Sequence, residues 1–75
     1  ELYEADPTNA SFKNGLAISF FKLGELHLDK NDIKEARSYF LKTKKILEEL
    51  SKSFPAYLEF SKNLVEVKKA LSKLK

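Results

Sequence analysis

Residues 20–43, with the sequence FFKLGELHLDKNDIKEARSYFLKT, decide the fold because they hold two helical patterns and the turn that joins them. On both sides of the turn, apolar residues recur at intervals of three and four, which is typical of amphipathic helices. Asn31 is a residue that can adopt the left-handed conformation at which helices end. Asp32 and Glu35 then form a pattern like a capping box, which begins a helix. The stretch therefore predicts two helices joined by a short turn, and helices connected in this way pack antiparallel.

Pro7 and Pro55 mark the limits of this hairpin, and each precedes a further helical pattern. We expect helices over about residues 9–29 and 32–53, and a third helix over about residues 55–73 with Pro55 in its first turn. No segment has the alternating pattern of a strand. The predicted fold is therefore all-α, an antiparallel helical hairpin plus a third helix. The predicted core stripes are Phe12, Leu16, Phe20, Leu23 and Leu26; Ile33, Ala36, Phe40, Thr43, Leu47 and Leu50; and Tyr57, Phe60, Leu64, Val67, Leu71 and Leu74.

The composition of the 75-residue chain excludes several classes of site. There is no cysteine and only one histidine, which excludes disulfides and thiolate sites and argues against a zinc site built on histidines. A net charge of +3, from 14 Lys and Arg against 11 Asp and Glu, is mild and does not demand nucleic acid. No apolar run has the length of a membrane span and no signal-peptide pattern opens the chain, so we expect a cytoplasmic protein. We find no catalytic constellation and expect neither enzymatic activity nor a cofactor or metal.

An internal repeat of 48 residues relates the first and third helices. Under this shift Pro7 falls on Pro55, and four apolar residues near the start of the chain fall on identical residues further along it. The matched pairs are Leu2 with Leu50, Phe12 with Phe60, Leu16 with Leu64, and Leu23 with Leu71.

This repeat divides the chain into three parts. Residues 1–7 are expected to be the end of a preceding unit, residues 8–54 one full helical hairpin, and residues 55–75 the first helix of a next unit. We therefore interpret the chain as a piece of a longer protein. Lys68 and Lys69 stand where the first helix has two aromatic residues, so the third helix is expected to act as a C-terminal cap with a soluble outer face.

The hairpin also contains an aromatic residue, then Leu-Gly, then a second residue with a ring, and finally an alanine and a phenylalanine. This pattern resembles the tetratricopeptide repeat. Small side chains at Gly24 and Ala36 allow two antiparallel helices to approach closely. The usual period of the family is 34 residues, so the period of 48 implies a long-helix variant in which each helix gains about two turns. The positions that carry the resemblance, and that would pack within the repeat, are Phe20, Leu23, Gly24, His27, Ala36, Phe40 and Thr43.

The resemblance implies a fragment of an α-solenoid and a non-catalytic function in protein–protein interaction. In this family the first helix of each pair lines a concave surface that contacts a peptide or protein partner. Members of the family that capture a C-terminal carboxylate have polar or basic residues near this part of the groove, whereas Glu25 is acidic. Capture of an acidic C-terminus is therefore not expected. Carried over by position, the groove residues are Ile18, Phe21, Lys22, Glu25, Leu28 and Asp29.

Three other functions stay open. The chain could be a free-standing three-helix bundle or a coiled-coil oligomerisation segment, and a closed bundle would bury Phe21 and Leu28 under the third helix. It could also be a tetratricopeptide-like regulatory arm of a larger bacterial-type or eukaryotic enzyme. Nucleic-acid binding through the scattered lysines is the least favoured, because glutamates lie among them and a solvated face explains them.

The first helix is apolar around more than half of its circumference, and such a helix needs cover on two sides. Arrays of this kind need about three repeats for stability, whereas this chain holds about one and a half. We therefore expect the isolated chain to associate with itself as a dimer or a higher oligomer.

Overall fold

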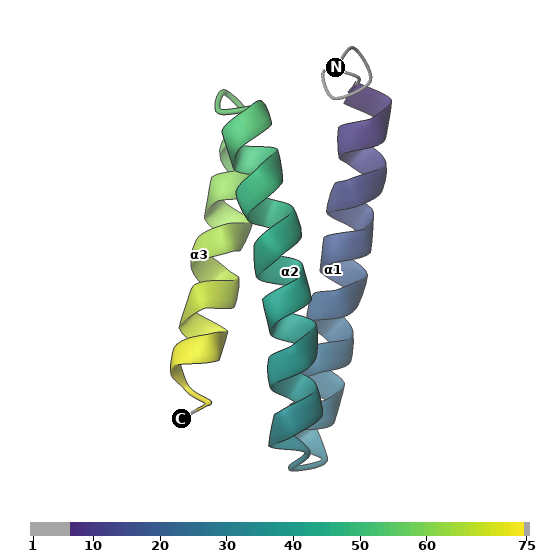
Figure 1. Cartoon of the computed structure of the whole chain (residues 1–75), viewed down its shortest axis with the longest axis vertical. Helices are drawn as coiled ribbons and strands as arrows, with labels where there is room; N and C mark the ends of the chain where they lie inside the picture. The colour runs from purple at the N-terminus through teal and green to yellow at the C-terminus, as the bar shows by residue number, and fades with distance from the viewer. Residues whose placement is uncertain (1–6, 75) are drawn as a thin grey trace.

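The computed structural model describes residues 7–74, which fold into three helices (Figure 1). α1 spans Pro7–Asp29, α2 spans Ile33–Ser53 and α3 spans Leu58–Ser72. α1 and α3 run in the same direction, and α2 runs antiparallel to both. No strand occurs in this part of the chain, so the predicted all-α fold of a helical hairpin with a third helix is confirmed. The preceding unit predicted for residues 1–7 lies, apart from Pro7, outside the described residues.

Asn31 ends the turn after α1 in the conformation that the sequence predicts. Its φ angle is 65°, in the left-handed region. The Asn31 N–H donates to the carbonyl of Leu28 at 2.9 Å, and the Asp32 N–H donates to the carbonyl of His27 at 2.8 Å. These two hydrogen bonds form a Schellman motif, which satisfies carbonyl groups that a helix end leaves free. The motif reverses the chain and brings α2 back against α1.

The predicted capping box at Asp32 is wrong. Asp32 does occupy the N-cap of α2, but its side chain makes no capping hydrogen bond. Its carboxylate Oδ2 instead lies 3.4 Å from Nδ1 of His27. The Schellman motif explains this contact, because its hydrogen bond from the Asp32 N–H to the His27 carbonyl brings these two positions together.

α3 begins three residues later than the sequence predicts, because Pro55 lies in the turn before it. Phe54 closes α2 with φ and ψ of −130° and 65°, outside the helical region that a following proline disfavours. Its N–H donates to the carbonyl of Leu50 at 2.8 Å. The Phe54 ring packs against the rings of Tyr57 and Phe60, with centroids 5.6 and 6.2 Å away. An aromatic cluster thus holds the turn, and the helix starts only after it.

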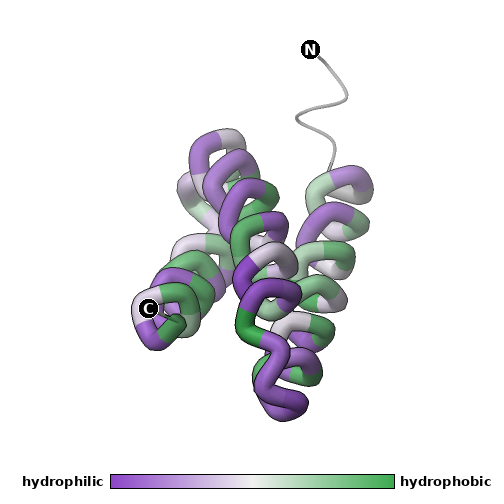
Figure 2. The backbone as a smooth tube through the Cα atoms, turned by 60° about the horizontal axis from the view of Figure 1, so that its bottom comes forward, coloured by the Kyte–Doolittle hydropathy of each residue, from purple (hydrophilic) through white to green (hydrophobic). Residues whose placement is uncertain are grey.

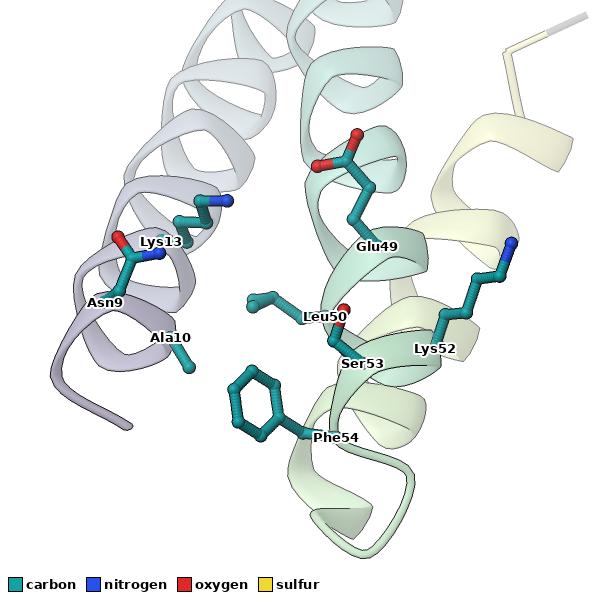
Figure 3. Close-up of a pocket in the computed structure, with 8 residues that line it drawn as sticks. All are labelled: Asn9, Ala10, Lys13, Glu49, Leu50, Lys52, Ser53 and Phe54. Atoms are coloured by element: carbon teal, nitrogen blue, oxygen red, sulfur yellow. The ribbon is translucent and has the colours of Figure 1, made fainter. Parts of the chain in front are cut away.

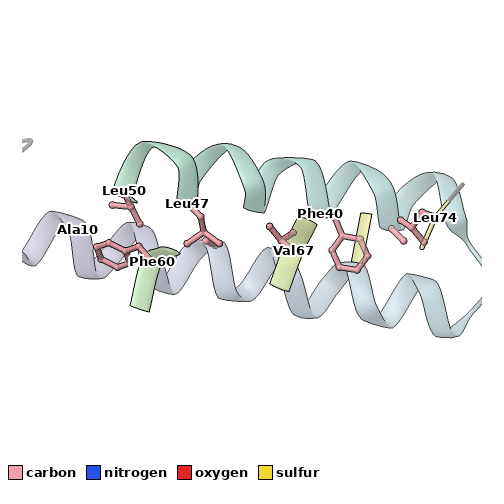
Figure 4. Close-up of a cluster of buried hydrophobic side chains, with 9 residues drawn as sticks. Ala10, Phe40, Leu47, Leu50, Phe60, Val67 and Leu74 are labelled. Atoms are coloured by element: carbon pink, nitrogen blue, oxygen red, sulfur yellow. The ribbon is translucent and has the colours of Figure 1, made fainter. Parts of the chain in front are cut away.

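α2 is the central helix of the core, and α1 and α3 both pack on it. Five of the six residues in its predicted stripe are buried, and the sixth, Ile33, is half-buried. The hydroxyl of Thr43, the one polar residue in this stripe, lies 3.2 Å from the carbonyl of Ala17 and 3.0 Å from that of Tyr39, so it is not left without a partner. Phe40, Leu47 and Leu50 of α2 are buried together with Phe60 and Val67 of α3 and with Leu74, which follows α3 (Figure 4). Ala36 and Thr43 of α2 are also buried.

The buried face of α1 differs from the predicted one. The stripe of large residues faces solvent, with exposed fractions of 70% for Phe12, 39% for Leu16, 38% for Leu23 and 48% for Leu26. The prediction that this stripe forms core is therefore wrong for these four residues. The face toward α2 consists of the buried residues Ala10, Asn14, Ala17 and Gly24 together with the half-buried Phe21 and Leu28.

Side-chain size explains this choice of face. Apolar residues recur along the whole of α1 (Figure 2), so hydrophobicity alone does not select one side of it. A Cβ atom at Gly24 would lie 2.6 Å from Cε1 of Phe40, closer than van der Waals contact allows. The absence of that atom lets the α1 backbone approach the Phe40 ring, which fills the space left by the small residues of α1.

Candidate binding groove

A groove runs between α1 and α3, with α2 as its floor. It contains two hollows of about 270 and 190 Å³, to which all three helices contribute. Phe21 lines both hollows, so they are parts of one groove. The larger hollow is lined by Ala17, Ile18, Phe21, Thr43, Leu47 and Asn63, and the smaller by Phe21, Glu25, Leu28, Phe40, Glu66, Lys69, Ala70 and Lys73.

The α1 wall of the groove contains four of the six residues that the resemblance predicts for it. Phe21 is anchored by the floor, because its ring packs against the Phe40 ring with centroids 5.3 Å apart. Lys22 and Asp29 are exposed and do not line either hollow. The four that do are Ile18, Phe21, Glu25 and Leu28.

The α3 wall of the groove was not predicted, although the internal repeat contains the signal that finds it. Three residues of this wall, Glu66, Lys69 and Lys73, stand 48 residues after Ile18, Phe21 and Glu25, respectively. Equivalent positions of α1 and α3 therefore face the same groove. The α1 wall is mostly apolar, whereas these α3 positions are charged.

A hydrogen bond connects the first part of α1 to the start of α3. The Nδ2 atom of Asn14 donates to Oε2 of Glu59 at 2.8 Å. The Asn14 side chain is almost completely buried, and its Oδ1 atom accepts no hydrogen bond from the described residues. The Asn14 amide is thus held by its bond to Glu59, and this bond sets the spacing of α1 and α3 near the start of both helices.

We expect Glu59→Ala to lower the free energy of unfolding by about 1–2 kcal/mol, because it leaves the buried amide of Asn14 without its acceptor. Urea unfolding followed by circular dichroism measures this loss. Glu66→Ala is the matched control, since this exposed glutamate lies further along the same helix and should change stability by no more than about 0.5 kcal/mol. Equal losses in the two variants would show that the cross-link does not stabilise the fold.

The positions predicted to pack within the repeat lie at the contact between α1 and α2, with one exception. The His27 ring stacks on Tyr39 with centroids 5.4 Å apart, which suits the packing role expected for this histidine. Leu23 is the exception, because it faces away from α2. Gly24, Ala36, Phe40 and Thr43 are buried, and Phe20 and His27 are half-buried.

A further hollow of about 300 Å³ lies between the start of α1 and the end of α2 (Figure 3). Leu50 and Phe54 project into the space between the two helices. Lys13 and Glu49 add charge of both signs to its lining. No residue predicted for the groove lines this hollow, so it is separate from the groove described above.

Within residues 7–74, no three His, Cys, Asp or Glu side chains are grouped so that they could hold a metal ion. Over the same range, none of the helices is both long enough and apolar enough to cross a bilayer. Comparisons of the chain with protein-family models, with curated proteins and with solved structures found no match.

Proposed function

We propose that this chain is a non-catalytic binding segment of a helical-repeat protein that resembles tetratricopeptide repeats, and that its groove receives a peptide or protein partner. The observation that carries the proposal is that Phe21 and Glu25 of α1 line the smaller hollow together with Lys69 and Lys73, the residues that stand 48 positions later. A solenoid is built from such translated units, and their stacking creates a continuous binding surface.

The open groove favours this proposal over a closed three-helix bundle. In a closed bundle α3 would cover Phe21 and Leu28. Both residues are only half-buried, and both line a hollow between α1 and α3. The two outer helices therefore leave the surface between them accessible to a partner.

The chemistry of the groove suits an amphipathic segment. Phe21, Leu28 and Ala70 offer apolar contact in the smaller hollow, which is where apolar anchors of a bound helix or strand would lie. Charged residues of both signs surround this apolar surface and would select the flanking residues of the partner. These charged residues are Glu25, Glu66, Lys69 and Lys73.

Selection from a library of random peptides displayed on phage tests this function. We expect enriched peptides with apolar anchors, and we expect Ile18→Glu to weaken their binding at least about tenfold, since it places a charge in an apolar hollow. Leu58→Glu is the control, because Leu58 is 76% exposed and lines neither hollow of the groove. Absence of enrichment, or binding that Ile18→Glu leaves unchanged, would contradict the proposal.

A further inference from the structure

α3, which forms one wall of the groove, is held near both of its ends. Close to its start, Glu59 accepts the hydrogen bond from Asn14 of α1. At the other end the helix stops at Ser72, and Leu74, which follows it, is only 4% exposed (Figure 4). The backbone carbonyl of Leu74 accepts a hydrogen bond from Nη2 of Arg37 on α2. The end of α3 is therefore held to the core by an apolar side chain and to α2 by a charged donor.

The last turn of α3 forms part of the smaller hollow of the groove. Lys69, Ala70 and Lys73 line this hollow. The Lys73 N–H donates to the carbonyls of Lys69 and Ala70 at 3.3 and 3.2 Å. The Leu74 N–H donates to the carbonyl of Leu71 at 3.0 Å. These hydrogen bonds join Leu74 to the last turn, so a displacement of Leu74 also displaces the residues that line the hollow.

The hydrogen bond from Asn14 to Glu59 cannot hold this end of α3, because Lys73 lies about 21 Å further along the helix than Glu59. The last carbonyl groups of a helix have no partner within it, and the last turn opens readily unless other groups bind them. An arginine that donates to a carbonyl at this end is favoured by the partial negative charge of the helix terminus. Arg37 therefore keeps in place the turn that the distant bond leaves unsupported.

We propose that Arg37 is a positioning residue of the groove, and that its hydrogen bond to Leu74 sets the distance between Glu25 on α1 and Lys73 on α3. This inference rests on the proposed function, because it concerns the groove that receives the partner. Arg37 lines neither hollow, so it acts through Leu74 and not by contact with the partner. Without this bond the last turn of α3 loosens, and the smaller hollow loses the fixed shape of its α3 wall.

Hydrogen exchange of single backbone amides of the whole chain, followed by NMR, tests this role without a ligand. Arg37→Met keeps a long side chain but removes its donors. In this variant the amides of Lys73 and Leu74 should exchange at least about tenfold faster, because the last turn of α3 opens more often. The amide of Leu47, in the middle of α2, should exchange at an unchanged rate, because the helices stay folded.

Two further variants control this experiment. Arg37→Lys should restore part of the protection of Leu74, since an ammonium group can donate to the same carbonyl. Lys45→Met removes a positive charge from an exposed position on α2 and should leave every rate unchanged. Unchanged exchange at Leu74 in Arg37→Met, or an equal acceleration at Leu47, would overturn the proposal, because the bond would then be absent or would only stabilise the whole fold.

The width of the groove gives a second readout, since the chain has no cysteine and two can be introduced for nitroxide labels. Labels at Glu25→Cys and Lys73→Cys lie on opposite walls of the smaller hollow. Electron paramagnetic resonance should show a broader range of distances between them when Arg37→Met is added.

The control pair is Ile18→Cys and Asn63→Cys, which face each other across the larger hollow, and its distances should stay the same. Equal broadening of both pairs, or of neither, would contradict the role of Arg37. Both readouts are taken without a ligand, so their failure would overturn this role alone, whereas the absence of selected peptides would overturn the function proposed for the groove.

Discussion

Replacement of Phe40 by alanine is expected to lower the free energy of unfolding by about 3–5 kcal/mol. Phe40 has no exposed surface, and its ring lies between Phe21 and the backbone of α1 at Gly24. Its removal leaves a cavity at the contact between α1 and α2, and the small residues of α1 cannot fill it. Urea unfolding followed by circular dichroism measures the loss.

The matched control is Phe12→Ala, which makes the same chemical change on the exposed face of α1. Phe12 is 70% exposed, so we expect a change of no more than about 0.5 kcal/mol. A loss from Phe12→Ala as large as that from Phe40→Ala would mean that α1 is rotated, with its large residues against α2.

The second large effect is expected at Gly24. Alanine there favours helix formation by about 1 kcal/mol, yet its Cβ would lie 2.6 Å from Cε1 and 2.8 Å from Cδ1 of Phe40. The ring is fully buried and packed, so α1 must move away from α2 to accept the methyl group. We expect Gly24→Ala to destabilise the fold by about 1–3 kcal/mol, the usual range for an overpacked core.

The control for Gly24→Ala is the same substitution at Gly15. No atom lies within 4 Å of a Cβ at Gly15, so Gly15→Ala should stabilise the chain by about 0.5–1 kcal/mol through helix propensity alone. Adding Phe40→Leu to Gly24→Ala should recover part of the lost stability, because the smaller side chain no longer meets the added methyl group. A double-mutant cycle of the two substitutions measures this contact. Stabilisation by alanine at both glycines would refute the close approach.

The three helices could be predicted from the sequence, whereas the face of α1 that packs on α2 could not. On α2 one stripe is apolar and the remainder is charged, so only one face can be buried. On α1 apolar residues surround the helix, and the size of a side chain alone points to the wrong face as core. The helix contact instead depends on how closely two backbones can approach, and that is set by small residues such as Ala17 and Gly24. A search for small residues at heptad spacing would have found this face.

The turns and the groove could also be predicted only in part from the sequence. Asn31 was predictable because its left-handed conformation is a local property. The side-chain contact of Asp32 and the place of Pro55 in the turn were not predictable, because the first depends on His27 and the second on an aromatic cluster. In the groove, the α1 wall followed from the resemblance, and the α3 wall needed the 48-residue shift to be applied to every groove position.

The central structural claim is that α1 meets α2 through its small residues, and a proton NOESY spectrum tests it most directly. We predict strong cross-peaks between the Hα protons of Gly24 and the ring protons of Phe40, since a Cβ at Gly24 would touch that ring. Cross-peaks from the Phe40 ring to the Leu23 methyl groups, with none to Gly24, would contradict it.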